Sequence, residues 1–360
     1  MNDQPFGTIV YIGTQGGGPD GGIHATRLDE ATGRLGPVSL VAAVDRPTWV
    51  LADTGRGLLH AVSEMGNAGD RIGDVMSFRI DGASAGLTLL GKAPSGGGGP
   101  THLALGPDGE TLFVANFGGG EVAVMPISAQ GVVQPVCARL VNSGSGPHRR
   151  QKGPHAHGVT LDPSAGFLLV ADMGADRIFL HRYDAARRAL EDAPDLHVAV
   201  PAGAGPRLLL FGKDGRFAYL LTELSAEIYV YGWDTATGRL TPQGMIRLDP
   251  PDAPGDPSAA GFTLSADGRF LYATNRRTGA IHVFAIDAAD GQLTPVQTID
   301  AGGDKPWAVE ITPTGRWLLV ANQASNLVRL FAVDPASGQL TATSAVLAVG
   351  APTSFAFASA

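Results

Sequence analysis

The sequence repeats one pattern at intervals of 46 to 54 residues, measured between seven prolines. Each copy has a proline, an alternating apolar segment, a Gly-containing turn and a second apolar segment that ends in a polar residue. Examples are GPTHLALGPDGETLFVANF (99–117) and KPWAVEITPTGRWLLVANQ (305–323). Alternation with a period of two predicts strands, and the turns predict hairpins. The seven prolines are Pro47, Pro100, Pro154, Pro206, Pro257, Pro306 and Pro352.

A third apolar segment, a second turn and a fourth segment complete each copy, as in GAIHVFAI followed by DAADGQL. The last proline has only PTSFAFASA after it, whereas TIVYIGT (8–14) has the pattern of a second strand. The two termini therefore share one unit, which closes a ring and leaves no open sheet edge. We predict an all-β seven-bladed β-propeller of four-stranded antiparallel blades. It forms a single domain over 1–360, with one blade closed by the N- and C-terminal strands.

The composition fits this fold and excludes several functions. The chain combines 50 Gly and 25 Pro with 44% hydrophobic residues, so it can bury a core between many turns. Its net charge of −8 argues against nucleic acid as a partner. No apolar stretch reaches the ~20 residues of a membrane span, and the N-terminus lacks the basic region of a signal peptide. We expect a cytoplasmic protein without a membrane partner, and a buried Cys137 that forms no disulfide.

Polar side chains gather at one end of the predicted ring. In a propeller, the starts of the inner strands and the ends of the second strands surround the same central mouth. Histidines and arginines at such a mouth, in an otherwise acidic chain, predict a concave site for an anionic ligand. The candidate residues are His102, His155, His157, Arg207 and Trp307 at inner-strand starts, and Glu64, Asn116, Asp172, Glu223, Asn275, Arg276, Asn322 and Gln323 at second-strand ends.

Several candidates also have simpler interpretations. His155 and His157 are two apart, so a strand would place them on one face, where a third ligand such as Asp172 or Glu223 could complete a metal site. Arg207 and Glu223 could form a structural ion pair. The asparagines at the strand ends could bind backbone there; they are Asn116, Asn275 and Asn322. The glycine runs 96–99 and 118–120 lack a following helix and a Lys-Ser/Thr pair, so flexible connections are expected rather than phosphate loops.

The stretches YIGT, GPTHLALGPDG, VANFGGGEV, GPHAHGV, GAGPR, ELSAEIYVY, DGRFLYATNR and PTGRWLLVANQ resemble the seven-bladed propeller lactonases. This family includes the bacterial 6-phosphogluconolactonase type and fungal carboxymuconate cyclases. The resemblance implies hydrolysis of an anionic lactone, such as 6-phospho-D-glucono-1,5-lactone or a related aldonolactone. Lactones are reactive enough for a general base and oxyanion stabilisation to suffice, so we expect no cofactor and no metal. The resemblance also implies a catalytic set of His155 or His157 with Arg207, Glu223 and Arg276. The other candidates at the mouth would then bind the substrate: His102, Asn116, Asp172, Glu64, Asn275, Trp307 and Gln323.

The chain departs from the family pattern at three positions. Leu208 stands where the family has histidine, Gly261 where it has an acidic residue, and Trp307 where it often has arginine. Because each of these changes removes a polar side chain, a less polar lactone is a second candidate substrate. We expect His157 or Glu223 to act as the base, and Arg207 and Arg276 to bind the oxyanion and an anionic group. A cyclase-type cycloisomerase and a non-catalytic binding propeller are the alternatives, because the fold by itself specifies no function.

Overall fold

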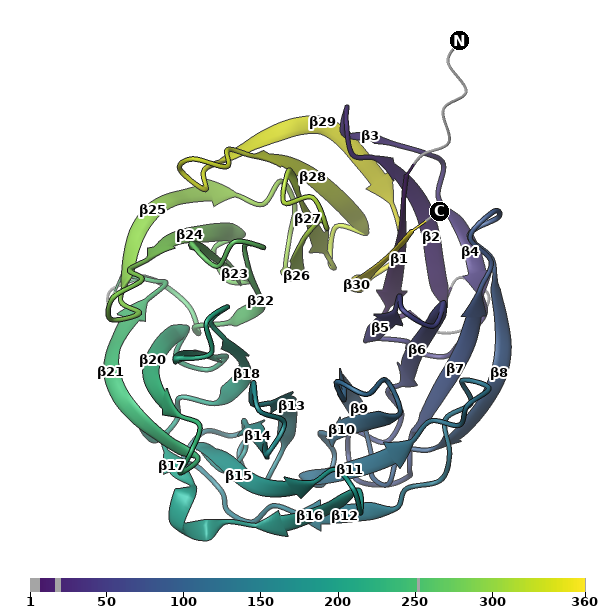
Figure 1. The fold of residues 1–360 in the computed structure, drawn as a ribbon. Coiled ribbons are helices and arrows are strands. Elements are labelled where there is room, and N and C mark those ends of the chain that lie inside the picture. Colours follow the sequence, from purple (N-terminus) through teal and green to yellow (C-terminus); the bar gives the residue numbers. More distant parts are fainter. Residues whose placement is uncertain (1–6, 17–20, 251–252, 360) are drawn as a thin grey trace.

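The computed structural model describes residues 7–16, 21–250 and 253–359. In it, seven antiparallel sheets surround a central opening, and each sheet runs from an innermost to an outermost strand (Figure 1). The predicted seven-bladed propeller is confirmed. Blade 1 joins the two ends of the chain, because β30 (Pro352–Ser359) pairs with β1 (Thr8–Thr14). Its outer strands are β2 (Ile23–Asp29), β3 (Arg34–Leu35) and β4 (Ser39–Ala42).

The other blades are continuous in sequence. Blade 2 has β5 (Val50–Asp53), β6 (Leu58–Ser63), β7 (Asp74–Ile80) and β8 (Leu87–Pro94). Blade 3 has β9 (Pro100–Leu105), β10 (Thr111–Asn116), β11 (Glu121–Pro126) and β12 (Ala138–Val141). Blade 4 has β13 (Ala156–Leu161), β14 (Phe167–Asp172), β15 (Arg177–Asp184), β16 (Ala189–Asp192), the 3₁₀ helix η2 (Pro194–Leu196) and β17 (Val198–Ala199).

The remaining three blades follow the same order. Blade 5 has β18 (Pro206–Phe211), β19 (Phe217–Thr222), β20 (Glu227–Asp234) and β21 (Arg239–Arg247). Blade 6 has β22 (Ala259–Leu264), β23 (Phe270–Asn275), β24 (Ala280–Ile286) and β25 (Leu293–Asp300). Blade 7 has β26 (Pro306–Ile311), β27 (Trp317–Asn322), β28 (Leu327–Val333) and β29 (Leu340–Ala348).

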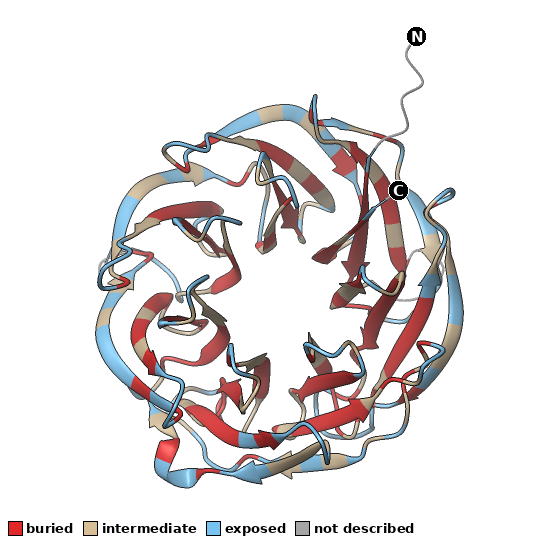
Figure 2. Cartoon of the chain, viewed as in Figure 1, coloured by how far each residue is buried: buried red, intermediate tan, exposed pale blue. Residues whose placement is uncertain are grey.

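The core lies between neighbouring blades. Every residue of the second strands β6, β10, β19 and β23 is buried, which explains why these segments read as continuous apolar runs. The outermost strands instead carry many exposed residues (Figure 2). Among the described residues, the buried apolar side chains form seven clusters, and each cluster is shared by two adjacent blades. The ring is thus stabilised at every blade-to-blade contact.

Aromatic residues of blades 5 and 6 pack against the turn between the two outer strands of the next blade. Gly338 lies in such a turn with φ +72°, and a Cβ there would stand 2.4 Å from the ring of Phe270. Tyr272, from the same strand as Phe270, donates a hydrogen bond to the carbonyl of Gly338 (3.1 Å). Tyr219 makes the equivalent bond to Gly291 (3.1 Å). The recurring glycine of these turns is therefore required both by the left-handed backbone and by the aromatic ring against it.

Cys137 contradicts the expectation of a buried thiol, because it is exposed. It lies just before β12, the outermost strand of blade 3, where side chains face solvent. Within the described part of the chain, no helix has the length and apolar character needed to cross a membrane.

Candidate active site

An extra residue at the start of the inner strands turns a side chain into the central cavity. In blade 5, Pro206 pairs with Thr222 and Leu208 pairs with Leu221, so Arg207 is left over as a β-bulge. Bulges re-aim side chains at the rims of sheets. The equivalent bulged residues are His157 in blade 4 and Trp307 in blade 7. All three side chains line one cavity of about 260 Å³.

The same register corrects the expectation that His155 and His157 face the same side. Ala156, not Pro154, pairs with Asp172, so the inner strand of blade 4 starts two residues later than the sequence alignment placed it. His155 lies before the strand, where its Nδ1 is 2.7 Å from the carbonyl oxygen of Phe117 and its ring stacks on the Phe117 ring. His157 is the bulge and faces the cavity. The geometry therefore gives the alternative interpretation of the two histidines as a metal pair no support.

The last residues of the second strands do not reach the cavity. Asn116 is fully buried and bonds to Ser95 through both side-chain atoms (2.7 and 3.1 Å). Asn322 likewise donates to the carbonyl of Ala301 (2.9 Å), and Asn275 donates to the carboxylate of Asp249 (2.6 Å). These contacts tie each strand end to the connection between blades.

Asp172 occupies the same strand-end position in blade 4 and has a similar structural environment. Its carboxylate accepts hydrogen bonds from the Asn142 side chain (2.9 Å) and from the backbone N–H of His155 (2.8 Å). It also accepts the backbone N–H groups of Gly174 and Ala175. The carboxylate is therefore committed to backbone and amide donors, and it does not line the cavity.

The residue one position further along reaches the cavity instead. Glu64, Glu223 and Arg276 all directly follow their strands and line it. Gln323 has the same position in blade 7, but it donates to the Oε1 of Gln15 (2.7 Å), and Gln15 is the residue that lines the cavity. A shift of one residue thus separates the side chains that hold the scaffold from those that face the central cavity.

The buried carboxylate of Glu223 is the centre of the site. It is 1% exposed, and its Oε2 lies 2.5 Å from Nη1 of Arg207. Its Oε1 lies 2.8 Å from Nη2 of Arg276 and 2.5 Å from Nη1 of Arg150. Arg207 and Arg276 are held further by the carbonyl oxygens of Ala260 and Ala259. Three guanidinium groups therefore share one carboxylate, which leaves the cluster with net positive charge.

These charges determine the protonation states. Burial by itself would raise the pKa of Glu223, but Arg276, Arg207 and Arg150 outweigh it and hold that pKa well below its usual range. Burial lowers the pKa of Arg207 to about 10, so its guanidinium stays charged at neutral pH. Burial and the nearby Arg207 keep the pKa of His157 well below 6.5. The site at neutral pH thus contains an ionised carboxylate and a neutral imidazole.

His157 has a defined tautomer. Its Nε2 contacts Nη1 of Arg207, and because a guanidinium can only donate, Nε2 is the accepting nitrogen. The same Nε2 lies 3.7 Å from Oε2 of Glu223. His102 also lines the cavity; its ring packs on Trp49 (4.1 Å between centroids), and burial lowers its pKa to about 3. Both histidines are therefore neutral.

Aromatic and apolar side chains form the rest of the wall. Phe117, Phe262 and Leu208 line the cavity. The ring of Trp307 lies under the guanidinium of Arg276, 4.6 Å from its Cζ, which is a cation–π contact. The cavity thus presents a positive cluster beside apolar surfaces.

Two polar lining residues had no signal in the repeat. Arg150 comes from the 142–155 connection between blades 3 and 4, and its reach into blade 5 depends on tertiary structure. Gln151 anchors that connection by donating to Asp176 (2.6 Å) and to the carbonyl of Met173 (2.8 Å).

The second of these residues, Glu310, lies within β26 and accepts a hydrogen bond from Thr263 (2.8 Å). Burial raises the pKa of its carboxyl group to about 7.

Comparison with known proteins identifies the family to which the chain belongs. Residues 9–357 match the family described as Lactonase, 7-bladed beta-propeller. The chain belongs to the seven-bladed β-propeller lactonases. A 6-phosphogluconolactonase of Bacillus subtilis is 28% identical over 306 residues, or 85% of each chain. The structure of a periplasmic gluconolactonase of Pseudomonas aeruginosa is 36% identical with a TM-score of 0.91, covering 98% of this chain and 99% of that one. A Lactobacillus plantarum protein of known structure is 31% identical with a TM-score of 0.89, over 98% of this chain and 99% of the other.

The structure explains one departure of this lactonase from its family pattern. At Gly261, a Cβ would stand 2.6 Å from the backbone nitrogen of Val309 and 2.9 Å from Oγ1 of Thr274. The inner strands of blades 6 and 7 approach so closely here that no side chain fits. An acidic residue is therefore excluded at Gly261 in this chain, and the cavity wall beside it is backbone.

Proposed function

We propose that this lactonase hydrolyses an aldono-1,5-lactone without the aid of a metal. The observation that carries the proposal is the buried Arg207–Glu223–Arg276 cluster, which opens into the cavity beside the neutral His157. Hydrolysis of a lactone creates negative charge on the carbonyl oxygen, and prearranged cationic donors stabilise such charge most effectively where water is largely excluded. Membership of the lactonase family supports the same reaction class.

The residues divide into two roles. Arg207 and Arg276 bind the carbonyl oxygen as it becomes an oxyanion. In the free site, Nε2 of His157 accepts a hydrogen bond from Arg207. When Arg207 turns to the carbonyl oxygen, Nε2 is released and takes a proton from the attacking water, whose oxygen bonds to the carbonyl carbon. The ring C–O bond then breaks, the imidazolium returns its proton to the leaving alkoxide, and the open aldonic acid releases its carboxyl proton to solvent as the aldonate. Glu223 lies 3.7 Å from His157, where its ionised carboxylate stabilises the protonated imidazole.

The cavity walls favour a lactone without a phosphate group. Trp307 and Leu208 supply apolar surface where the family pattern has arginine and histidine. Arg207 and Arg276 pair with Glu223 and are assigned to the carbonyl oxygen, so neither is left for a second anionic group. We therefore propose glucono-1,5-lactone as a better substrate than its 6-phosphorylated form. Arg150, whose side chain is 41% exposed, is the cation best placed to meet a phosphate at the entrance.

The test measures acid release at constant pH, with both lactones, over the spontaneous rate. We expect acceleration, and a fall in kcat of roughly 100-fold in His157→Ala and in Glu223→Gln, as is typical when a general base or charge stabiliser is lost. Glu227→Gln is the matched control, because Glu227 pairs with Arg247 on blade 5 and does not line the cavity. EDTA is expected to leave the rate unchanged.

The outcomes separate the alternatives. No acceleration of any lactone would contradict hydrolysis and favour a binding propeller, and turnover of a carboxymuconate alone would indicate a cycloisomerase. Unchanged turnover in both cavity variants would contradict the roles given to His157 and Glu223. A preference for the phosphorylated lactone, reduced selectively by Arg150→Ala, would overturn the substrate ranking. The cytoplasmic location expected from the sequence stays a prediction, since one relative is described as periplasmic.

A further inference from the structure

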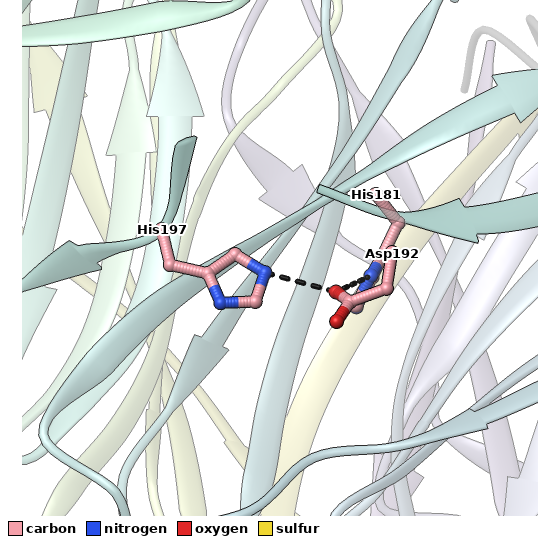
Figure 3. A group of neighbouring side chains, drawn as sticks. All are labelled: His181, Asp192 and His197. Carbon is pink, nitrogen blue, oxygen red and sulfur yellow. Dashed lines mark hydrogen bonds and ion pairs between the residues drawn. The ribbon is translucent and has the colours of Figure 1, made fainter. Parts of the chain in front are cut away.

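A group of two histidines and an aspartate lies on the outer part of blade 4, apart from the central cavity (Figure 3). His181 is on β15, Asp192 ends β16, and His197 follows η2. The side chains meet because His181 and Asp192 are directly paired across the two strands, while the 3₁₀ turn carries His197 back toward them. None of the three lines the cavity.

The three side chains converge on one carboxylate oxygen. Oδ1 of Asp192 lies 2.9 Å from Nε2 of His197 and 3.1 Å from Nδ1 of His181. One potential ligand atom from each of the three side chains lies within 4.8 Å of the other two. A tetrahedral zinc ion with bonds of ~2.0–2.1 Å separates its ligands by about 3.3 Å. Small side-chain rotations would therefore bring these atoms to ligand positions around one ion.

His181 is the second observation that points to a missing ligand. It is 2% exposed, and neither of its ring nitrogens has a hydrogen-bond partner in the described structure. Its Nδ1 makes one polar contact, 3.1 Å from Oδ1 of Asp192, and its Nε2 makes none. A buried ring nitrogen without a hydrogen-bond partner costs free energy unless another group satisfies it.

We propose that His181, Asp192 and His197 form a structural binding site for one divalent zinc-type ion. Two imidazoles and a carboxylate are ligands that Zn²⁺ accepts, and the half-exposed Asp192 leaves room for water as a fourth ligand. The ion joins β15 to both sides of η2, where the outer strand is interrupted between β16 and β17. It stabilises this edge of blade 4 and takes no part in lactone hydrolysis.

The test is a calorimetric and spectroscopic titration of the full chain with Zn²⁺ and Co²⁺ after treatment with EDTA. A Cys137→Ser background removes the exposed thiol as a competing ligand. We expect one ion per chain, a visible Co²⁺ spectrum of tetrahedral type, and a Tm rise of about 3–4 °C at a metal concentration near 100 times Kd. Asp192→Asn and His197→Ala should weaken binding at least ~10-fold, as even second-shell changes do.

Three results would overturn the proposal. They are no binding by the Cys137→Ser protein, binding of equal affinity in Asp192→Asn and His197→Ala, and loss of binding in a His24→Gln control on blade 1. Asp192→Asn keeps the test valid if a histidine variant fails to fold, because Asp192 is half exposed. The rate of lactone hydrolysis is measured separately and should be the same with and without metal. Failure of the metal site would therefore not bear on the proposed lactonase function.

Discussion

Replacement of Glu223 by glutamine tests whether one carboxylate holds the arginine cluster together. The substitution keeps the shape of the side chain and removes its charge, while Arg207 and Arg276 remain beside it at 2.5 and 2.8 Å. Removing one partner from a buried ion pair costs ~3–5 kcal/mol of folding free energy. With an unfolding entropy of ~2.1 cal/mol/K per residue, this chain of 360 residues loses about 1.3 °C of Tm per kcal/mol. The expected loss is therefore about 4–7 °C.

Thermal unfolding of the parent and the variant, in the absence and presence of phosphate, is the assay. Phosphate should stabilise Glu223→Gln more than the parent, because the anion can replace the missing charge between the arginines. Glu227→Gln is the control: its partner Arg247 has a half-exposed side chain, so we expect a loss of about 1 kcal/mol or less. A Tm loss no larger in Glu223→Gln than in Glu227→Gln, without extra stabilisation by phosphate, would refute the reasoning.

Three further predictions concern packing and pH. Gly338→Ala should cost about 1–3 kcal/mol more than Gly315→Ala in denaturant unfolding, because both glycines have φ +72° but only Gly338 faces an aromatic ring, that of Phe270; equal losses would contradict this. The pKa of Glu310 is raised to about 7, so as pH rises from about 4.5 to 7 its carboxyl group loses the proton in the unfolded chain first, and the free energy of unfolding falls. Glu310→Gln should remove up to ~3 kcal/mol of that fall. An unchanged pH dependence of Tm in the variant would contradict this prediction. Because the pKa of His157 is lowered, the acidic limb of kcat/KM should lie below pH 6.5, and a limb at or above that value would show a different base.

The fold could be predicted from the sequence because strands and turns are specified by residues that are close together in the chain. Alternating apolar segments and Gly-containing turns specify strands and hairpins within a few residues of each other, and their repetition implies a ring. The half-units at the two ends then require a shared blade, which the pairing of β30 with β1 confirms. The sequence also indicated which blades carry His157, Arg207, Glu223 and Arg276.

The direction of each side chain depended on pairing between strands, which local patterns do not contain. A bulge of one residue turns His157 into the cavity and leaves His155 against Phe117. Asn116 is the last residue of its strand and bonds to Ser95, whereas Glu223 directly follows its strand and lines the cavity. A difference of one position therefore decides whether a side chain faces the cavity. Strand periodicity cannot locate such a bulge, because the extra residue arises from the hydrogen-bond register with the neighbouring strand.

The tertiary structure alone brought together residues that have no regular spacing. Arg150 reaches Glu223 from a connection 73 residues earlier in the chain. His181, Asp192 and His197 meet only because β15 and β16 pair and η2 turns the chain back. The sequence by itself therefore determined the ring, its closure and the blades that bear charge. The packing of the ring decided which of those charges share one buried carboxylate, because a contact across blades depends on where the chain closes in space and not on distance along it.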